Sequence, residues 1–257
     1  MNKSQDVQIM KGAESEFKYS QDQIGILLLH GFLGNPAEMK YVGEKLFEIG
    51  YTISIPRYPG HGTSLKEMIK TSTSDWVIFA RESLIELQSK CKIVYIVGLS
   101  MGGLITLLLA KEFNIKKIVL MSVPTAIPSK IIYFVPFLSR FIKILPKPKS
   151  NKGINSPEAR DKHVCYDDGL PVRQTWELHC LIKKTIKSLS EVYSETLIMQ
   201  STGDEVIPKN SADLLYSNLG SKKKQIIWFQ KSNHVISVDY DKDQVAKEII
   251  DFFGMNS

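Results

Sequence analysis

Residues 93–111 read IVYIVGLSMGGLITLLLAK, and this stretch decides the fold. The β-branched run before the first glycine predicts a buried strand, and the leucine-rich run after the last glycine predicts a helix. Ser100 lies between them, with Gly98 and Gly102 two positions away on either side. Side chains at those two positions would collide in a turn sharp enough to join a strand directly to a helix, which explains the glycines. Such a turn lifts the serine hydroxyl to a helix N-terminus, where partial positive charge favours a negatively charged group.

The same pentapeptide has two interpretations. A strand, a serine between two glycines and a helix form the pattern typical of a nucleophile elbow. A Gly/Ser turn that only connects two buried elements is the simpler alternative, because this glycine spacing also arises by chance. The strand and the helix on either side favour the elbow, since that motif requires this context.

Apolar runs and amphipathic segments alternate along most of the chain. The runs that predict strands lie at residues 24–29, 51–55, 93–97, 115–121, 196–200 and 225–229. The segments that predict helices lie at residues 37–49, 75–90, 103–111, 210–218 and 242–253. Asp75 is the expected N-cap of the second helix, and an edge strand or hairpin is expected within residues 1–23. Strands that alternate with helices indicate an α/β fold with a mostly parallel central sheet flanked by helices.

The alternation stops between residues 124 and 189. No strand pattern is evident there, and prolines punctuate the stretch at Pro128, Pro136, Pro146, Pro148, Pro157 and Pro171. We interpret residues 124–189 as a small helical cap. It is inserted into a core domain that comprises residues 1–123 and 190–257, where the regular alternation resumes.

Length and composition indicate one globular domain with an insertion. The chain has 257 residues, of which 43% are hydrophobic and 23% charged, a balance that argues against disorder. The net charge is +6, and lysines are densest at Lys143, Lys147, Lys149, Lys152 and residues 222–224. A solvated surface is the simplest explanation, and weak attraction to anionic lipid or nucleic acid is the alternative. We expect no nucleic-acid partner, because no basic stripe alternates with aromatic residues.

Three features of the sequence predict a cytoplasmic protein. Cys91, Cys165 and Cys180 are an odd number without metal-ligand spacing, so neither disulfides nor a bound metal are expected. The N-terminus has no apolar signal core. No apolar run reaches membrane-spanning length, because a proline and two basic residues interrupt the nearest candidate at residues 131–145.

A serine nucleophile needs a base that accepts its proton and an acid that orients the base. After this type of elbow, the acid and then the histidine follow in loops beyond late strands. Of the five histidines, only His234 follows a strand in the C-terminal part; elsewhere a lone loop histidine would be incidental. For the acid we favour Asp204 over its neighbour Glu205, because the preceding Gly203 lets the chain turn the carboxylate inward. An ordinary Gly-Asp turn is the alternative.

A developing oxyanion needs amide donors. The residue after the nucleophile, Met101, supplies one, and the loop after the first apolar run supplies the second. Phe32 has the right place in that loop, and a plain core aromatic is the alternative. His30 and His61 flank glycines in tight loops, where we expect structural hydrogen bonds and not a role as base.

Six motifs resemble the bacterial carboxylesterase and monoacylglycerol lipase group of α/β-hydrolases. They are His30-Gly31-Phe32-Leu33-Gly34-Asn35, Pro59-Gly60-His61-Gly62-Thr63, Asp75-Trp76, Gly98-Leu99-Ser100-Met101-Gly102-Gly103, Gly203-Asp204-Glu205 and His234-Val235-Ile236. The resemblance covers about residues 24–253 except most of the cap. The motifs are specific when taken together, and no single one is specific alone.

By this resemblance, Ser100 is the nucleophile, Asp204 the acid and His234 the base. The backbone amides of Phe32 and Met101 are the oxyanion donors. Members of the group hydrolyse carboxylic esters of short to medium acyl chains, and some hydrolyse monoacylglycerols, beneath a small helical cap. The expected reaction passes through an acyl-enzyme on the serine and needs no metal or organic cofactor.

Two alternatives to a carboxylesterase stay open. One is a thioesterase or C–C hydrolase that uses the same three residues. The other is a sensor that binds a small apolar ligand in a hydrolase pocket. The expected partners are a small apolar ester and, at most, the periphery of a lipid surface.

The cap contains an apolar patch that matches no motif of the group. It comprises Ile131, Ile132, Phe134, Val135, Phe137, Leu138, Phe141 and Ile142. Phe134, Phe137 and Phe141, together with Phe32, are candidates to line an acyl pocket. Contact with a lipid surface and plain packing on the core are the other two interpretations.

Overall fold

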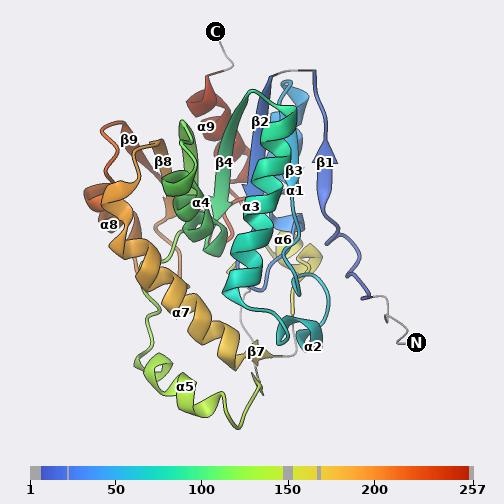
Figure 1. Ribbon diagram of the computed structural model, residues 1–257, viewed down its shortest axis with the longest axis vertical. Helices are drawn as coiled ribbons and strands as arrows, with labels where there is room; N and C mark the ends of the chain where they lie inside the picture. The colour runs from blue at the N-terminus through green and yellow to red at the C-terminus, as the bar shows by residue number, and fades with distance from the viewer. Residues whose placement is uncertain (1–6, 22, 147–152, 167–168, 255–257) are drawn as a thin grey trace.

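A seven-stranded sheet forms the centre of the molecule in a computed structural model that describes residues 7–21, 23–146, 153–166 and 169–254 (Figure 1). Several residues named above lie outside these ranges, namely residues 1–6, Lys147, Pro148, Lys149 and Lys152. The strand order is β1-β3-β2-β4-β5-β8-β9. The first strand pairs antiparallel with β3, and the other neighbours in the sheet pair in parallel.

The strands of this sheet match the predicted apolar runs closely. They are β1 Glu16–Lys18, β2 Ile24–Leu29, β3 Thr52–Ile55, β4 Ile93–Leu99, β5 Lys117–Met121, β8 Glu195–Ser201 and β9 Lys224–Phe229. The expected edge strand near the N-terminus is the short β1. The predicted α/β fold with a mostly parallel sheet is confirmed.

Helices cover both faces of the sheet. They are α1 Ala37–Glu48, α2 Leu65–Met68, α3 Thr73–Lys90, α4 Met101–Glu112, α5 Val135–Leu138, α6 Pro157–Lys162, α7 Val172–Lys187, α8 Ser211–Asn218 and α9 Lys242–Phe253, with 3-10 turns η1 Lys130–Phe134 and η2 Leu189–Glu191. The sequence predicts α9 to the residue, and α2 has no counterpart among the predicted helices.

Two hydrophobic layers hold the helices to the sheet, because successive residues of a strand point to opposite faces. In β2, Leu27 and Leu29 belong to the core shared with α3, α4, α7 and α8. Ile26 and Leu28 belong to the core shared with α1 and α9. Every one of these four side chains is fully buried, so the strand reads as a continuous apolar run and not as an alternating one.

The start of α3 differs from the prediction. The N-cap is Ser72, whose side chain accepts the backbone N–H of Asp75. Asp75 occupies the third helical position, where its carboxylate accepts the Ser72 backbone N–H at 2.8 Å. The two residues form a capping box, a pattern that places the acid three residues after the cap. The helix therefore begins at Thr73.

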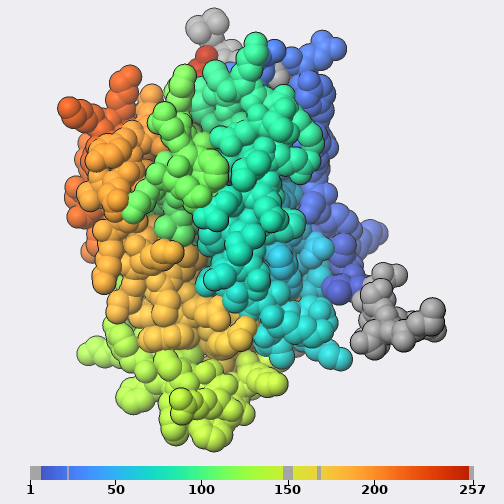
Figure 2. Space-filling model, viewed as in Figure 1, coloured from blue at the N-terminus to red at the C-terminus, as the bar shows by residue number. Residues whose placement is uncertain are grey.

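The insertion contains more than helices. A two-residue strand β6 Ile144–Leu145 pairs antiparallel with β7 Leu170–Pro171, which corrects the expectation that residues 124–189 hold no strand. Such short pairs leave no periodic signal in a sequence. The segment from η1 to β6 forms one end of the molecule, with α5 lying against α7 (Figures 1 and 2).

The long helix α7 connects the insertion to the core. Near its middle, Leu181 and Ile182 are buried in the same cluster as the residues of α4. Toward its start, Val172 packs with Ile132 and Val135 of the cap. The division into a core of 1–123 and 190–257 and a cap of 124–189 stays a prediction, since this helix contributes to both.

Candidate active site

The turn from β4 into α4 has the strained geometry that the glycine spacing predicts. Ser100 has φ 53° and ψ −116°, a conformation that L residues rarely adopt and that carries a strain of about 1–3 kcal/mol. A Cβ on Gly98 would lie 2.5 Å from the Gly102 carbonyl oxygen, and a Cβ on Gly102 would lie 2.1 Å from the Leu29 carbonyl oxygen. The glycines therefore permit both the turn and the close approach of α4 to the sheet.

The structure brings three predicted residues into one hydrogen-bonded chain. The His234 Nε2 atom lies 2.9 Å from the Ser100 Oγ atom. On the other side of the ring, Nδ1 lies 2.8 Å from the Asp204 Oδ2 atom. The histidine and the aspartate are buried, and the serine is partly exposed. The three side chains come from loops after β4, β8 and β9, which all end at the same edge of the sheet.

The loop after β8 separates the two candidate acids. Asp204 uses its Oδ1 atom to accept the backbone N–H groups of Val206 and Ile207, at 2.8 and 3.2 Å, which leaves Oδ2 for the histidine. Glu205 points elsewhere and accepts a hydrogen bond from the Asn233 side chain at 3.1 Å. The carboxylate that contacts His234 is thus the one favoured from the sequence.

Buried carboxylates that the sequence analysis did not single out shape the histidine loop. Asp239 accepts the backbone N–H groups of Asn233, Asn155 and Ser156 at 2.7–2.8 Å. Asp241 accepts that of Ser232 at 2.9 Å. These side chains fix the loop that carries His234. Nothing in the sequence pattern distinguishes them from ordinary helix-initiating acids before α9.

The loop after β2 forms a tight turn beside the serine. The Gly34 N–H donates to the Gly31 carbonyl at 3.3 Å, and Leu33 between them has φ 62°, in the left-handed region. Phe32 lies in this turn, and Met101 is the first residue of α4, so its amide has no acceptor within the helix. Both predicted oxyanion donors therefore belong to backbone segments that border Ser100.

A cavity of about 320 Å³ opens beside the serine. Its apolar wall includes Phe32, Leu33, Leu99, Leu178, Val206 and Val235. Ser100 and His234 line the same cavity, together with two further polar residues, Glu38 and His163. The mainly apolar lining suits a small ligand with an apolar part.

The aromatic residues predicted to line an acyl pocket separate into two groups. Phe32 lines the cavity. Phe134, Phe137 and Phe141 do not line it, and they are 74%, 68% and 73% exposed on the outer surface of the cap. The physical reason is that η1 and α5 pack on α7 through Ile132 and Val135, which turns the three phenylalanines outward. In this structure they are a surface feature and not a pocket wall.

Glu38 and His163 are cavity residues that sequence reasoning missed. The Glu38 side chain is only 6% exposed, and its Oε1 atom lies 3.6 Å from the His163 Nε2 atom. Its Oε2 atom accepts the Gly31 N–H at 3.0 Å. An acid in the first turn of a helix usually stabilises the helix from the surface, so the sequence gives no reason to expect this one inside the site.

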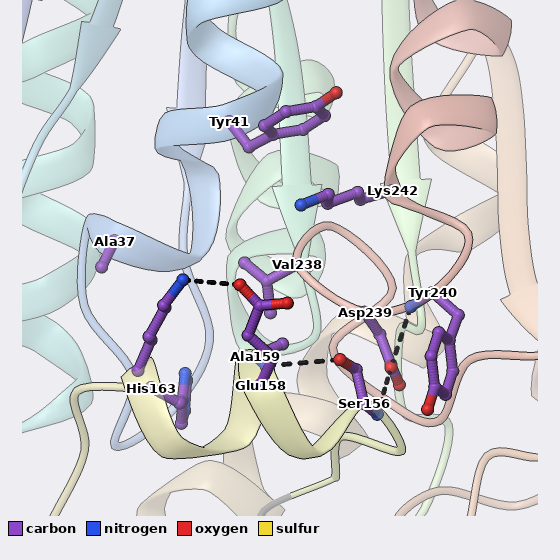
Figure 3. Close-up of a pocket in the computed structure, with 11 residues that line it drawn as sticks. Ala37, Tyr41, Ser156, Glu158, Ala159, His163, Val238, Asp239, Tyr240 and Lys242 are labelled. Atoms are coloured by element: carbon purple, nitrogen blue, oxygen red, sulfur yellow. Dashed lines mark hydrogen bonds and ion pairs between the residues drawn. The ribbon is translucent and has the colours of Figure 1, made fainter.

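His163 also borders a second cavity of about 400 Å³ (Figure 3). That cavity lies between α1, α6 and the segment that leads into α9, and both polar and apolar side chains line it. Figure 3 shows His163 at the end of α6, on the same side as Ala37 at the start of α1. The His163 imidazole thus lines both the cavity beside Ser100 and this second cavity.

His30 and His61 are buried structural residues, as expected. The His30 Nδ1 atom lies 3.0 Å from the Gly31 carbonyl oxygen, and its Nε2 atom accepts the Tyr58 N–H at 3.4 Å. Burial lowers the pKa of His30 to about 3, and burial together with its neighbour His30 lowers the pKa of His61 well below the usual range. Both imidazoles are therefore neutral at pH 7, and their role is structural and not that of the base.

The described residues contain neither a metal-binding cluster nor a membrane-spanning helix. No group of three or more His, Cys, Asp or Glu side chains in this part of the chain is arranged to hold a metal ion. None of the helices in the same residues is long and apolar enough to cross a bilayer.

The strand order, the elbow and the Ser–His–Asp chain define the class of α/β-hydrolases. A family model described as "Serine aminopeptidase, S33" matches residues 21–241. The chain belongs to this family.

Two relatives are similar in sequence over nearly the whole length of the chain. A thermostable monoacylglycerol lipase from Bacillus sp. (strain H-257) is 30% identical over 257 residues, 99% of each protein. A carboxylesterase from Bacillus subtilis (strain 168) is 31% identical over 237 residues, which cover 92% of this chain and 94% of that one.

A solved structure is similar over the same length. It comes from work on LipS and LipT, two metagenome-derived lipolytic enzymes, and has a TM-score of 0.89 at 29% identity, covering 95% of this chain and 98% of that chain. Family, relatives and structure confirm that the chain is a hydrolase of the carboxylesterase and monoacylglycerol lipase group, as predicted.

Proposed function

We propose that the protein hydrolyses carboxylic esters through an acyl-enzyme on Ser100. The observation that carries this proposal is the hydrogen-bonded chain in which His234 lies 2.9 Å from the serine Oγ and 2.8 Å from the Asp204 carboxylate. A neutral imidazole held in this way accepts the serine proton while the carboxylate stabilises the resulting positive charge. The serine oxygen then attacks the ester carbonyl.

The backbone amides of Phe32 and Met101 bind the negative oxygen of the tetrahedral intermediate. Collapse of this intermediate releases the alcohol, to which His234 returns the proton. Water then enters, gives its proton to the same histidine and attacks the acyl carbonyl, which frees the acid and restores the serine. No step needs a group beyond these side chains, the two amides and water.

The substrate class that we propose is esters of short to medium acyl chains, including monoacylglycerols. The cavity volume of about 320 Å³ is at the small end for ligand sites and its wall is mainly apolar, which supports a short or medium acyl group. The names of the two relatives, a monoacylglycerol lipase and a carboxylesterase, support ester substrates with monoacylglycerols among them.

A substrate panel tests this proposal. p-Nitrophenyl esters of two to sixteen carbons, a monoacylglycerol, an acyl-CoA thioester and an aminoacyl p-nitroanilide are compared by kcat/KM. We expect a maximum among medium-chain esters and turnover of the monoacylglycerol. A larger value for the thioester identifies a thioesterase, and a larger value for the anilide identifies the peptidase activity that the family's description names. Absence of all turnover, with no fluorophosphonate label on Ser100, contradicts the proposal.

We also propose that the exposed tip of the cap contacts anionic lipid surfaces. This tip comprises η1, α5 and the residues up to 142, where Ile131, Tyr133, Phe134, Phe137 and Phe141 are each at least 63% exposed. Lys130 and Arg140 lie exposed within the tip and Lys143 lies exposed directly after it, and no acidic residue occurs between Glu112 and Glu158. Exposed aromatic side chains ringed by cations suit an interface with anionic headgroups.

Sedimentation with vesicles tests this contact. The protein is mixed with phosphatidylglycerol vesicles and, separately, with phosphatidylcholine vesicles. We expect binding to the anionic vesicles, weakened by salt and lost when Phe137 and Phe141 are both changed to serine. Tyr193→Ser is the matched control, since Tyr193 is as exposed but lies outside the cap. Equal binding by both variants contradicts the proposal.

The cytoplasmic location predicted from the sequence stays a proposal. Its support is that Cys91, Cys165 and Cys180 are an odd number of cysteines without metal-ligand spacing, which suits a reducing compartment.

A further inference from the structure

We propose that Glu38 is a positioning residue for the oxyanion hole and that Gly34 is a glycine in order to make room for it. The inference rests on the proposed function, because it assigns the Phe32 amide as an oxyanion donor. It adds two residues, one on α1 and one in the turn after β2, to those that determine the rate.

The first support is the way in which the peptide before Phe32 is held. The Gly31 N–H donates to the Glu38 Oε2 atom at 3.0 Å. The Gly31 carbonyl oxygen lies 3.0 Å from the His30 Nδ1 atom and accepts the Gly34 N–H at 3.3 Å. In a trans peptide the carbonyl of Gly31 and the N–H of Phe32 point in opposite directions. Fixing both polar groups of Gly31 therefore fixes the direction of the Phe32 N–H.

The second support is strain in the same turn. Leu33 has φ 62°, a left-handed conformation that is unfavourable for a residue with a Cβ by about 1–2 kcal/mol. A turn with this strain relaxes unless its surroundings hold it. Glu38 supplies such a restraint from the first turn of α1, where the positive end of the helix favours its carboxylate.

The third support is the space at Gly34. A Cβ there would lie 2.2–2.3 Å from both carboxylate oxygens and the carboxyl carbon of Glu38. The backbone of Gly34 does not have positive φ, so its conformation alone would admit alanine. The glycine is therefore needed for the carboxylate that lies across the turn, and not for the turn itself.

The fourth support is the distance to the nucleophile. A Cβ on Gly31 would lie 3.4 Å from the Glu38 Oε2 atom and 3.4 Å from the Ser100 Cβ atom. The carboxylate and the serine thus border the same glycine. A buried carboxylate needs partners, and the Gly31 N–H and the His163 ring at 3.6 Å meet that need.

A double-mutant cycle on Glu38 and Gly34 tests the inference. Glu38→Ala, Gly34→Ala and the double variant are compared with the parent by kcat and KM on one medium-chain p-nitrophenyl ester. Each single change leaves the Phe32 amide in place but misaligned, so kcat should fall by about 10–100-fold, less than the ~10²–10³-fold loss of a whole donor. KM should change by less than about threefold. The double variant should be no slower than Glu38→Ala, because alanine at 34 then meets no carboxylate.

Two further variants separate positioning from a plain structural role. Glu38→Gln keeps an oxygen that accepts the Gly31 N–H and should recover kcat to within about fivefold of the parent. Glu44→Ala removes an exposed carboxylate from the same helix and should leave kcat unchanged. Thermal unfolding of each variant shows whether it is folded at the assay temperature. Should Glu38→Ala not fold, Gly34→Ala and Glu38→Gln decide the question alone.

Three outcomes overturn the inference. They are an unchanged kcat in Glu38→Ala, a double variant whose loss is the product of the single losses, and a Glu38→Gln variant as slow as Glu38→Ala. A parent that turns over esters and labels at Ser100 while the cycle gives one of these results refutes the role of Glu38 alone. A parent without ester turnover refutes the proposed function instead.

Discussion

The loops at the ends of the parallel strands and the tip of the cap differ in the burial of their side chains. Around Ser100, the acid, the base and the turn after β2 are buried and held by backbone hydrogen bonds. At the tip, five large apolar side chains face outward. The geometry for bond cleavage is therefore fixed before a substrate arrives, whereas the large apolar side chains at the tip of the cap are exposed to solvent.

The largest expected effect lies at the nucleophile. Ser100→Ala removes the only atom that forms the acyl-enzyme, so kcat should fall by about 10⁶-fold, as in other serine hydrolases. The fold should survive, because alanine fits the same turn. Ester hydrolysis and thermal unfolding measure the two. Near-normal turnover by a folded variant would mean that another residue is the nucleophile.

The next effect distinguishes the two adjacent acids. Asp204→Asn should lower kcat by about 10⁴-fold, because the amide no longer stabilises the charged, correctly oriented imidazole. Glu205→Gln keeps an acceptor for the Asn233 side chain and should stay within about tenfold of the parent. Steady-state kinetics on one ester gives both numbers. The opposite ranking of the two variants would show that Glu205 is the orienting acid.

A smaller effect separates the cavity wall from the tip of the cap. Leu178 of α7 lines the cavity, and Phe137 is exposed. Leu178→Ala should weaken the gain in kcat/KM with acyl length, to which each buried methylene contributes about 0.8 kcal/mol. Phe137→Ala should leave that gain intact for esters in solution. The chain-length profile of each variant is the measurement, and a profile altered by Phe137→Ala would place the tip of the cap over the acyl group.

A further effect concerns stability and pH and not the rate of catalysis. Since burial lowers the pKa of His30 from 6.5 to about 3, the unfolded state binds a proton that the folded state excludes in this range. The free energy of unfolding should therefore fall as pH decreases below 6.5, by up to about 1.4 kcal/mol per pH unit for this group. His30→Asn should show a shallower decline in urea unfolding between pH 6.5 and 4. Parallel curves for the two proteins would contradict this origin.

Most of the fold is predictable because it depends on runs of apolar residues. The sequence predicts β2 and α9 to the residue, since one is a continuous buried run and the other repeats its apolar residues at helical spacing. The start of α3 was not, because Ser72 and Asp75 both suit a helix start and only their reciprocal bonds reveal which one caps it. The pair β6 and β7 is too short to give a period.

Some residues of the candidate site could likewise be predicted from the sequence, and others could not. Ser100, Asp204 and His234 were predictable because their chemistry imposes a chain order and a strand before each of them. The location of Phe134, Phe137 and Phe141 was not, because an apolar run at the surface and one over a pocket read alike. Glu38 was not either, since its burial depends on a glycine four positions earlier and on a turn that folds back over it.

The carboxylate of Asp239 connects the insertion to the loop that carries His234, and this connection affects how the cap can move. It accepts amides from the histidine loop and from residues 155–156 of the insertion at once, and the Val235 N–H donates to the Gly153 carbonyl at 3.0 Å beside them. One end of the cap and the loop that carries the base are therefore a single unit of local stability. Their amides should show a common free energy of opening in hydrogen exchange. If the cap opens to admit substrate, the η1 end is the part that moves, and the segment held against the His234 loop stays in place.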